Sequence, residues 1–186
     1  MQRQRIISLI PSATEIVCAL GAQGQLVGRS HECDYPLDVR RLPICSQPKY
    51  RSNGSSAEIN KEVMTILREA LSIYRIDVER IRVLKPTHII TQSQCAVCAV
   101  STDELREALH AFLHQDDVSI IDLSPESLEH VFQNISAVAD ALDVHDSGEK
   151  LLRKMKTSMA AIQSIAKESS SKPRVAHIEW IEPIMV

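Results

Sequence analysis

The stretch that most constrains the fold is Arg5–Gly21, RIISLIPSATEIVCALG, which predicts a buried strand that runs directly into a helix. The apolar run Ile6–Ile10 suits a strand covered on both faces. Pro11 ends that strand, because proline has no N–H to give to a ladder. Ser12 opens an S-A-T-E capping box, and Gly21 is a typical helix stop. Such a strand-to-helix turn places free N–H groups at the carboxyl edge of a parallel sheet, where open α/β sheets bind ligands.

The rest of the chain alternates strands with helices, which predicts an α/β fold with a parallel sheet and helices on both faces. The segment 43–56, rich in proline, serine, glycine and asparagine, is expected to be a long loop. A lone helix on the order of 30 Å long is expected at 147–167. The further strands are expected at 26–30, 88–91, 118–121 and 174–180.

Two more segments carry helix-capping signals. Ser55 with Glu58 is a second capping box. Ser124-Pro125 is expected to begin the helix that follows the fourth strand, with proline in its first turn.

Composition and charge exclude several classes of partner and location. The net charge of -3 gives no electrostatic affinity for nucleic acid or for anionic membranes, and no apolar run is long enough to enter a bilayer. The N-terminus has no apolar signal segment, so we expect a cytoplasmic protein. The five cysteines are an odd number, which favours reduced thiols over a disulfide framework.

Two loops that follow parallel strands carry residues able to bind a metal: His31 and Cys33 after the second strand, and Cys95 and Cys98 after the third. These loops leave the sheet at the same edge, so the four side chains could converge on Zn²⁺ or iron. Other interpretations stay open: a C-x-x-C redox pair, His31 approaching the cobalt of a corrinoid, or cysteines that are simply small and buried.

Polar and aromatic side chains near the same edge are the candidate ligand-binding residues. The serine and threonine of the first helix could donate to an anionic or amide group, or merely cap the helix. The acidic residues could accept from a polar ligand or orient His31, or belong to a solvated loop; the tryptophan could stack on a ligand or fill the core. The set is Ser12, Thr14, His31, Glu32, Asp34, Tyr35, Gln92, Glu179 and Trp180.

The order of these pieces resembles a known family. RIISLIPSATEIVCALG, LVGRSHECDYP, LKPTHIITQ, the lone helix and RVAHIEW together are similar to the iron-siderophore/cobalamin substrate-binding proteins of ABC transporters. HECDYP and QCAVCAV resemble the non-secreted branch described as cobalamin-binding proteins.

The resemblance implies a class III periplasmic-binding-protein fold. Residues 1–145 would be a Rossmann-like N-terminal lobe, 146–171 the helix between lobes, and 172–186 the first strand of a second lobe that is mostly missing. A ligand would lie between the lobes, and Glu79 would be the carboxylate that docks on a permease.

The motifs for catalysis are absent: there is no Ser/His/Asp order, Walker loop or H-E-x-x-H. We therefore expect a non-catalytic protein that binds a small molecule or metal chelate, with cobalamin or a related corrinoid as the ligand. A zinc or iron metalloprotein or redox protein is the alternative. An incomplete cleft would also expose apolar surface, which predicts self-association.

Overall fold

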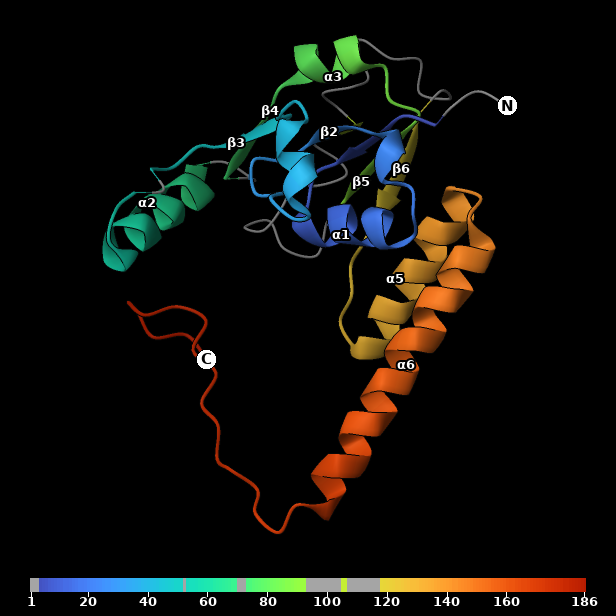
Figure 1. Cartoon of the computed structure of the whole chain (residues 1–186). Helices are drawn as coiled ribbons and strands as arrows, with labels where there is room; N and C mark the ends of the chain where they lie inside the picture. The colour runs from blue at the N-terminus through green and yellow to red at the C-terminus, as the bar shows by residue number, and fades with distance from the viewer. Residues whose placement is uncertain (1–3, 52, 70–72, 93–104, 107–117) are drawn as a thin grey trace.

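The computed structural model describes residues 4–51, 53–69, 73–92, 105–106 and 118–186. Its centre is a four-stranded sheet with the order β2-β1-β5-β6, and every neighbouring pair in it is parallel (Figure 1). The parallel sheet expected from the sequence is therefore confirmed. Its strands are β1 (Ile6–Ser8), β2 (Leu26–Arg29), β5 (His88–Thr91) and β6 (Ser119–Asp122).

Helices cover both faces of this sheet. Successive residues of its central strands point to opposite sides, and because those residues are mostly apolar, both faces are buried. Ile6 and Ile90 belong to a core shared with α1, α5 and the first half of α6. Ile7 and Ile89 belong to a second core, against which α2 and α3 pack. The helices are α1 (Pro11–Ala19), α2 (Ser56–Glu69), α3 (Val78–Leu84), α5 (Leu128–Ala141) and α6 (His145–Glu168), with 3-10 turns at Gln23–Gln25 and Leu37–Arg41.

A second, two-stranded antiparallel sheet, called the small sheet below, extends from the end of β2. Its strands are β3 (Ser46–Pro48) and β4 (Tyr74–Ile76), and α2 lies in the chain between them. The Cys45 N–H donates to the Arg29 carbonyl at 2.7 Å, which connects the small sheet to the main sheet. The expectation of an uninterrupted loop over 43–56 is wrong at β3.

Two helix starts differ from the sequence expectations. Helix α1 begins at Pro11 itself, with Ile10 as its N-cap and no side-chain cap, so Ser12 does not form the expected capping box. A proline in the first turn has no N–H to satisfy, which removes one of the donors that a cap would serve. Helix α5 is capped by Ser127, whose side chain accepts from the His130 N–H, and not by the serine of Ser124-Pro125. The Ser55 capping box is confirmed.

Helix α6 is the long helix expected from the sequence, and only its first half packs on α5. Leu151, Leu152 and Met155 contact the core, whereas every residue from Lys156 to the end of the helix is exposed. The chain then continues as an extended tail. The strand expected at 174–180 is wrong, because no strand of the described structure lies beside this segment; only an isolated bridge joins Trp180 and Met185.

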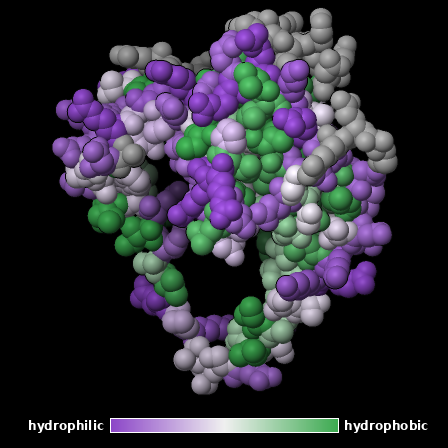
Figure 2. Space-filling view, turned by 45° about the horizontal axis from the view of Figure 1, so that its top comes forward, coloured by the Kyte–Doolittle hydropathy of each residue, from purple (hydrophilic) through white to green (hydrophobic). Residues whose placement is uncertain are grey.

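The tail and the lower half of α6 stand apart from the α/β lobe. Figure 2 shows an open gap between them and the lobe, with hydrophobic side chains along the lower end of the helix. Within the described residues, no helix has both the length and the apolar composition needed to cross a bilayer.

Candidate functional site

The carboxyl edge of the sheet brings together loops that are distant in the sequence. The Ser30 N–H donates to the Ser8 carbonyl, and the Leu9 N–H donates to the Ile90 carbonyl, each at 2.8 Å. The loops after β2 and β5 therefore leave on either side of β1. With strands ~4.8 Å apart, their roots are about 10 Å from each other.

A compact group of polar and aromatic side chains lies at the β2 side of this edge. We name it the His31 cluster; its members are His31, Glu32, Ser46, Tyr50 and Tyr74. The Tyr74 hydroxyl donates to Glu32 Oε1 at 3.1 Å, and His31 Nε2 lies 3.9 Å from the same oxygen. The ring centroids of His31 and Tyr74 are 5.2 Å apart, and those of Tyr50 and Tyr74 are 6.5 Å apart. Such tilted ring pairs are favourable aromatic geometry.

Strand β3 of the small sheet contacts His31 through Ser46. Ser46, on β3, is buried, and its hydroxyl lies 3.0 Å from His31 Nδ1. The His31 N–H also donates to that hydroxyl oxygen, at 3.4 Å. The small sheet therefore positions the imidazole of His31. The His31 side chain keeps 20% of its surface exposed.

Burial sets the protonation of the cluster. It lowers the pKa of His31, although the Glu32 carboxylate and the Ser46 main chain act in the opposite direction. Burial and the nearby Glu32 carboxylate raise the pKa of Tyr74. At neutral pH both side chains are therefore uncharged, and Tyr74 is a hydrogen-bond donor.

Arg29 fixes the loop that carries His31 and Glu32. Its side chain is buried, and it donates to the carbonyls of Ser30, Cys33 and Arg40 at 3.0, 2.9 and 3.2 Å. Among the described residues no ion pair joins Arg29 to a carboxylate, so the guanidinium acts as a hub for main-chain carbonyls.

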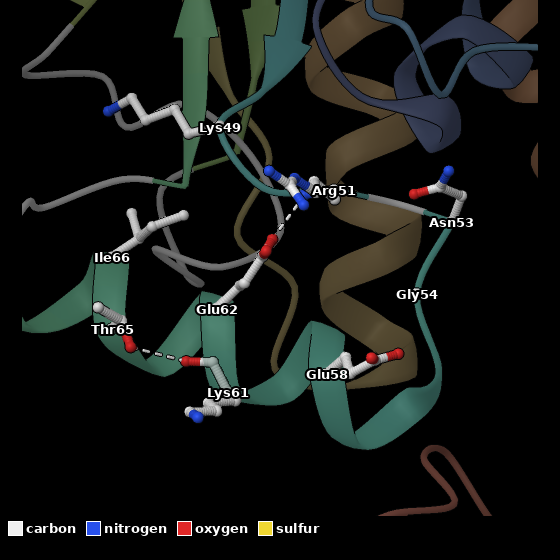
Figure 3. A pocket seen from close by; sticks show the side chains of 9 residues that line it. All are labelled: Lys49, Arg51, Asn53, Gly54, Glu58, Lys61, Glu62, Thr65 and Ile66. Atoms are coloured by element: carbon white, nitrogen blue, oxygen red, sulfur yellow. Dashed lines mark hydrogen bonds between the residues drawn. The ribbon is translucent and has the colours of Figure 1, made fainter.

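Apart from the His31 cluster, the structure has a hollow of about 740 Å³ between the loop after β3 and one side of α2. Figure 3 shows Arg51 above the helix, with Glu62 rising toward it. The Arg51 N–H donates to Glu62 Oε2 at 2.8 Å. The lining carries side chains of both charge signs: Lys49, Arg51, Asn53, Gly54, Glu58, Lys61, Glu62, Thr65 and Ile66. Because the charges are mixed, this hollow favours neither anions nor cations.

Comparison with known proteins decides the family. A family model described as "Periplasmic binding protein" matches residues 6–185. The chain belongs to this family. The resemblance to ABC-transporter substrate-binding proteins for iron chelates and cobalamin is confirmed; the narrower assignment to a non-secreted branch stays a prediction.

Individual relatives of this chain are distant. An uncharacterized ABC transporter substrate-binding lipoprotein, YvrC of Bacillus subtilis (strain 168), is 24% identical over 168 residues, which are 90% of this chain and 43% of YvrC. The apo heme-binding protein RhuT from Roseiflexus sp. RS-1 is 25% identical, with a TM-score of 0.62 over 91% of this chain and 52% of RhuT. The vitamin B12-binding protein BtuF of Vibrio cholerae is 22% identical, with a TM-score of 0.64 over 97% of this chain and 57% of BtuF. The chain thus spans about half the length of these relatives.

Several residues expected to bind ligand have other roles or partners in the structure. Thr14 is buried and donates to the Ser8 hydroxyl, so it links α1 to β1. Asp34 is ion-paired with Arg40 at 3.1 Å. Ser12, in the first turn of α1, and Tyr35 are exposed, and Gln92 is half-buried directly after β5.

The tail residues do not join the edge of the sheet. The Glu179 N–H donates to the Met185 carbonyl, and Trp180 Nε1 donates to the Glu182 carbonyl, so both contacts stay within the tail. Figure 1 places this tail apart from the sheet. Glu79, the expected docking carboxylate, lies on α3 and pairs with Arg82 at 2.9 Å.

The expected metal site cannot be assembled from the described part of the chain. Cys95 and Cys98 lie outside it, and among the residues inside it no group of three or more His, Cys, Asp or Glu side chains could hold a metal ion. The Cys33 thiol is fully buried and lies 3.4 Å from the Ser30 hydroxyl. The metal site stays a prediction, and the structure adds no support to it.

Sequence reasoning missed Ser46, Tyr50 and Tyr74 as members of the site. The alternation of Tyr74, Arg75 and Ile76 before a capped helix is a weak strand signal that could have indicated β4. No sequence signal indicates that β4 would bring Tyr74 against the loop after β2, because that contact depends on the pairing of β3 with β4.

Proposed function

We propose that this chain acts by binding, without catalysis, as the ligand-binding lobe of an ABC-transporter substrate-binding protein, and that its ligand is a corrinoid or a related metal chelate. The observation that carries the proposal is the His31 cluster. Tilted aromatic rings, of which His31 and Tyr50 are partly exposed and Tyr74 is buried, lie with an acidic side chain at the carboxyl edge of a parallel sheet, where open α/β folds hold ligands.

The family supports this class of ligand. Among its solved relatives, RhuT is named for binding heme and BtuF for binding vitamin B12. Both ligands are large, flat metal macrocycles. The partly exposed rings of His31 and Tyr50, which both contact the buried Tyr74, offer a surface on which the face or rim of such a ligand could pack.

Permease docking through Glu79 belongs to the same proposal. Its side chain is 64% exposed, and its partner Arg82 is exposed as well. An exposed ion pair of this kind contributes little to stability, so the carboxylate can exchange Arg82 for a cation of a membrane partner at low cost.

Calorimetric titration of the chain with cyanocobalamin, cobinamide and haemin tests the ligand class. We expect saturable one-to-one binding of at least one of the three, in the micromolar range or tighter. The double variant Glu32→Ala/Tyr74→Ala should weaken that binding at least about tenfold, because the acceptor is removed together with the ring that supports His31 and Tyr50.

The matched control is Asp38→Asn, which removes an exposed carboxylate whose one ion pair within the described residues is with the exposed Arg41. It should bind like the unaltered chain. If none of the three ligands binds saturably, or if the double variant binds as well as the control, the proposed site is wrong.

A further inference from the structure

The hydrogen bonds around Ser46 determine which ring nitrogen of His31 carries the proton. The Ser46 hydroxyl oxygen already accepts from the His31 N–H, so its own proton is free to be donated. Among the described residues, His31 Nδ1 at 3.0 Å is the acceptor within reach of that proton. A buried hydroxyl rarely leaves its proton unused. Nδ1 is therefore the acceptor, and in the neutral ring the proton is on Nε2.

The Nε2–H bond then lies on the side of Glu32, whose Oε1 is 3.9 Å away. Oε1 also accepts from the Tyr74 hydroxyl. A donor on His31 and a donor on Tyr74 thus approach the same carboxylate oxygen. The Tyr74 hydrogen bond holds Glu32 in place, the His31 ring lies beside it beyond hydrogen-bond distance, and 39% of the Glu32 side-chain surface remains exposed at the edge of the sheet.

From this geometry we infer that Glu32 selects ligands by accepting a hydrogen bond from an uncharged donor on them, such as an amide or hydroxyl group, while the Tyr74 hydroxyl positions its carboxylate and Ser46 orients the His31 ring beside it. This inference rests on the proposed function, because it concerns the same site. It names the chemistry of the ligand's periphery: donor groups are favoured, and carboxylates are repelled by Glu32.

The same hydrogen bonds give His31 a role other than metal coordination. A nitrogen that carries a proton has no lone pair for a metal, and Nδ1 faces the buried Ser46 hydroxyl. Ser46 therefore orients His31 beside Glu32, and to ligate the metal of a bound chelate the ring would first have to give up either its Nε2 proton or its hydrogen bond to Ser46.

Nitrogen-15 NMR of the histidine rings tests the first half of the inference without any ligand. We expect His31, assigned by its loss in His31→Gln, to show a protonated Nε2 and an unprotonated Nδ1 at neutral pH. Ser46→Ala should release this preference, and Ser46→Thr, which keeps a hydroxyl, should retain it. A His31 ring protonated on Nδ1 in the unaltered chain would overturn the assignment.

Paired corrinoids test the second half. Cobinamide has amide side chains, whereas cobyrinic acid has carboxylates on the same ring and its methyl ester has neither charge nor donor. We expect cobinamide to bind at least about tenfold more tightly than either of the other two compounds, because neither of them can donate a hydrogen bond to the charged Glu32 acceptor. Glu32→Gln and Tyr74→Phe should reduce this ratio, and the Asp38→Asn control should not.

The outcomes separate the two proposals. Equal binding of all three corrinoids by the unaltered chain, or a ratio that survives Glu32→Gln, would refute the selection by Glu32 while leaving the proposed function intact. Binding of none of the three would refute corrinoid selection together with the corrinoid form of the proposed function, and the NMR result would still decide the role of His31.

Discussion

At the residue scale, Arg29 is the side chain on which the candidate site most depends. It is 8% exposed and spans carbonyls of Ser30, Cys33 and Arg40, so it holds both ends of the loop that carries His31 and Glu32. A buried cation bonded to several carbonyls costs desolvation energy, which its charged hydrogen bonds offset. This geometry explains how a loop with little regular structure can keep a fixed shape.

Replacing Arg29 with methionine should lower the free energy of unfolding by about 2–3 kcal/mol, because three carbonyls lose charged donors. Urea denaturation measures the change. The control is Arg41→Met, since the Arg41 side chain is 86% exposed and pairs only with Asp38 in the part of the chain that the structure describes. Equal effects of the two substitutions would show that Arg29 does not hold the loop.

Histidine burial makes stability depend on pH. Burial lowers the pKa of both His31 and His88 below the ordinary value of 6.5. Below pH 6.5 the unfolded chain therefore takes up protons that the folded chain does not, and the free energy of unfolding should fall as pH drops through 6.5 until the folded histidines also titrate. The double variant His31→Gln/His88→Gln should show a shallower fall in thermal unfolding scans between pH 7.5 and 5.

His145 provides a control of opposite sign. Its hydrogen bond to Asp140 raises its pKa, so its stabilisation is complete below pH 6.5 and is lost as pH rises through the raised value. His145→Gln should therefore remove a gain in stability that accompanies the drop in pH from the raised pKa to 6.5, so the net fall between pH 7.5 and 5 becomes larger. If His145→Gln and the double variant changed the slope in the same direction, this assignment of the pKa shifts would be wrong.

At the scale of elements, α5 and α6 are joined by an unusually close contact. A Cβ built on Gly148 would lie 2.6 Å from the Cβ of Ala139, so the helices can approach this closely only because Gly148 has no side chain. Helix α6 is thereby set against the lobe at its first turn, and its direction over the following residues is fixed.

Gly148→Ala should lower the free energy of unfolding by about 1–3 kcal/mol, the usual cost of forcing an extra methyl into a packed contact. The double variant Gly148→Ala/Ala139→Gly moves the methyl to the other helix and should recover most of the loss. Urea denaturation of the double variant and of the two single variants, Gly148→Ala and Ala139→Gly, gives the coupling. Additive effects of the two substitutions would show that the contact is not tight.

Some strands of the fold could be predicted from the sequence and others could not. The runs Ile6–Ile10 and His88–Thr91 predict central strands because a doubly covered parallel strand must be apolar on both faces. Strand β3 escaped prediction because it is short, contains Pro48, and gains its partner only through residues 74–76. The expected strand at 174–180 failed for the converse reason: an apolar alternation forms a strand only where another strand offers its hydrogen bonds.

The candidate site was predictable only in part, for the same physical reason. His31 and Glu32 follow a strand whose direction could be inferred, so their place at the carboxyl edge was expected. Tyr74 is 42 residues from Glu32 along the chain, and no local pattern encodes that contact. Ser12 and Thr14 were correctly placed near the edge, but the side chain of Thr14 serves the packing of α1 on β1.

At the scale of the whole molecule, apolar surface is concentrated away from the lobe. Met159, Ile162 and Ile165 on the lower half of α6 are 40%, 66% and 71% exposed. Exposed isoleucines recur along the tail, at Ile178, Ile181 and Ile184. These residues lie on elements that have few tertiary contacts in the described structure, as the open gap in Figure 2 illustrates.

We expect this 186-residue chain to self-associate through that surface, because contiguous exposed apolar groups on a helix favour burial against a second copy. Sedimentation velocity should show a mean sedimentation coefficient that rises with protein concentration. Ile162→Lys/Ile165→Lys should suppress the rise, since both side chains lie one turn apart on the exposed half of α6. Val83→Lys, a change at an apolar residue that is 72% exposed on α3, is the control and should leave the rise unchanged. A sharp monomer boundary at every concentration would mean that the lower half of α6 remains solvated, and the helix would then owe its stability to its own hydrogen bonds and to the α5 contact alone.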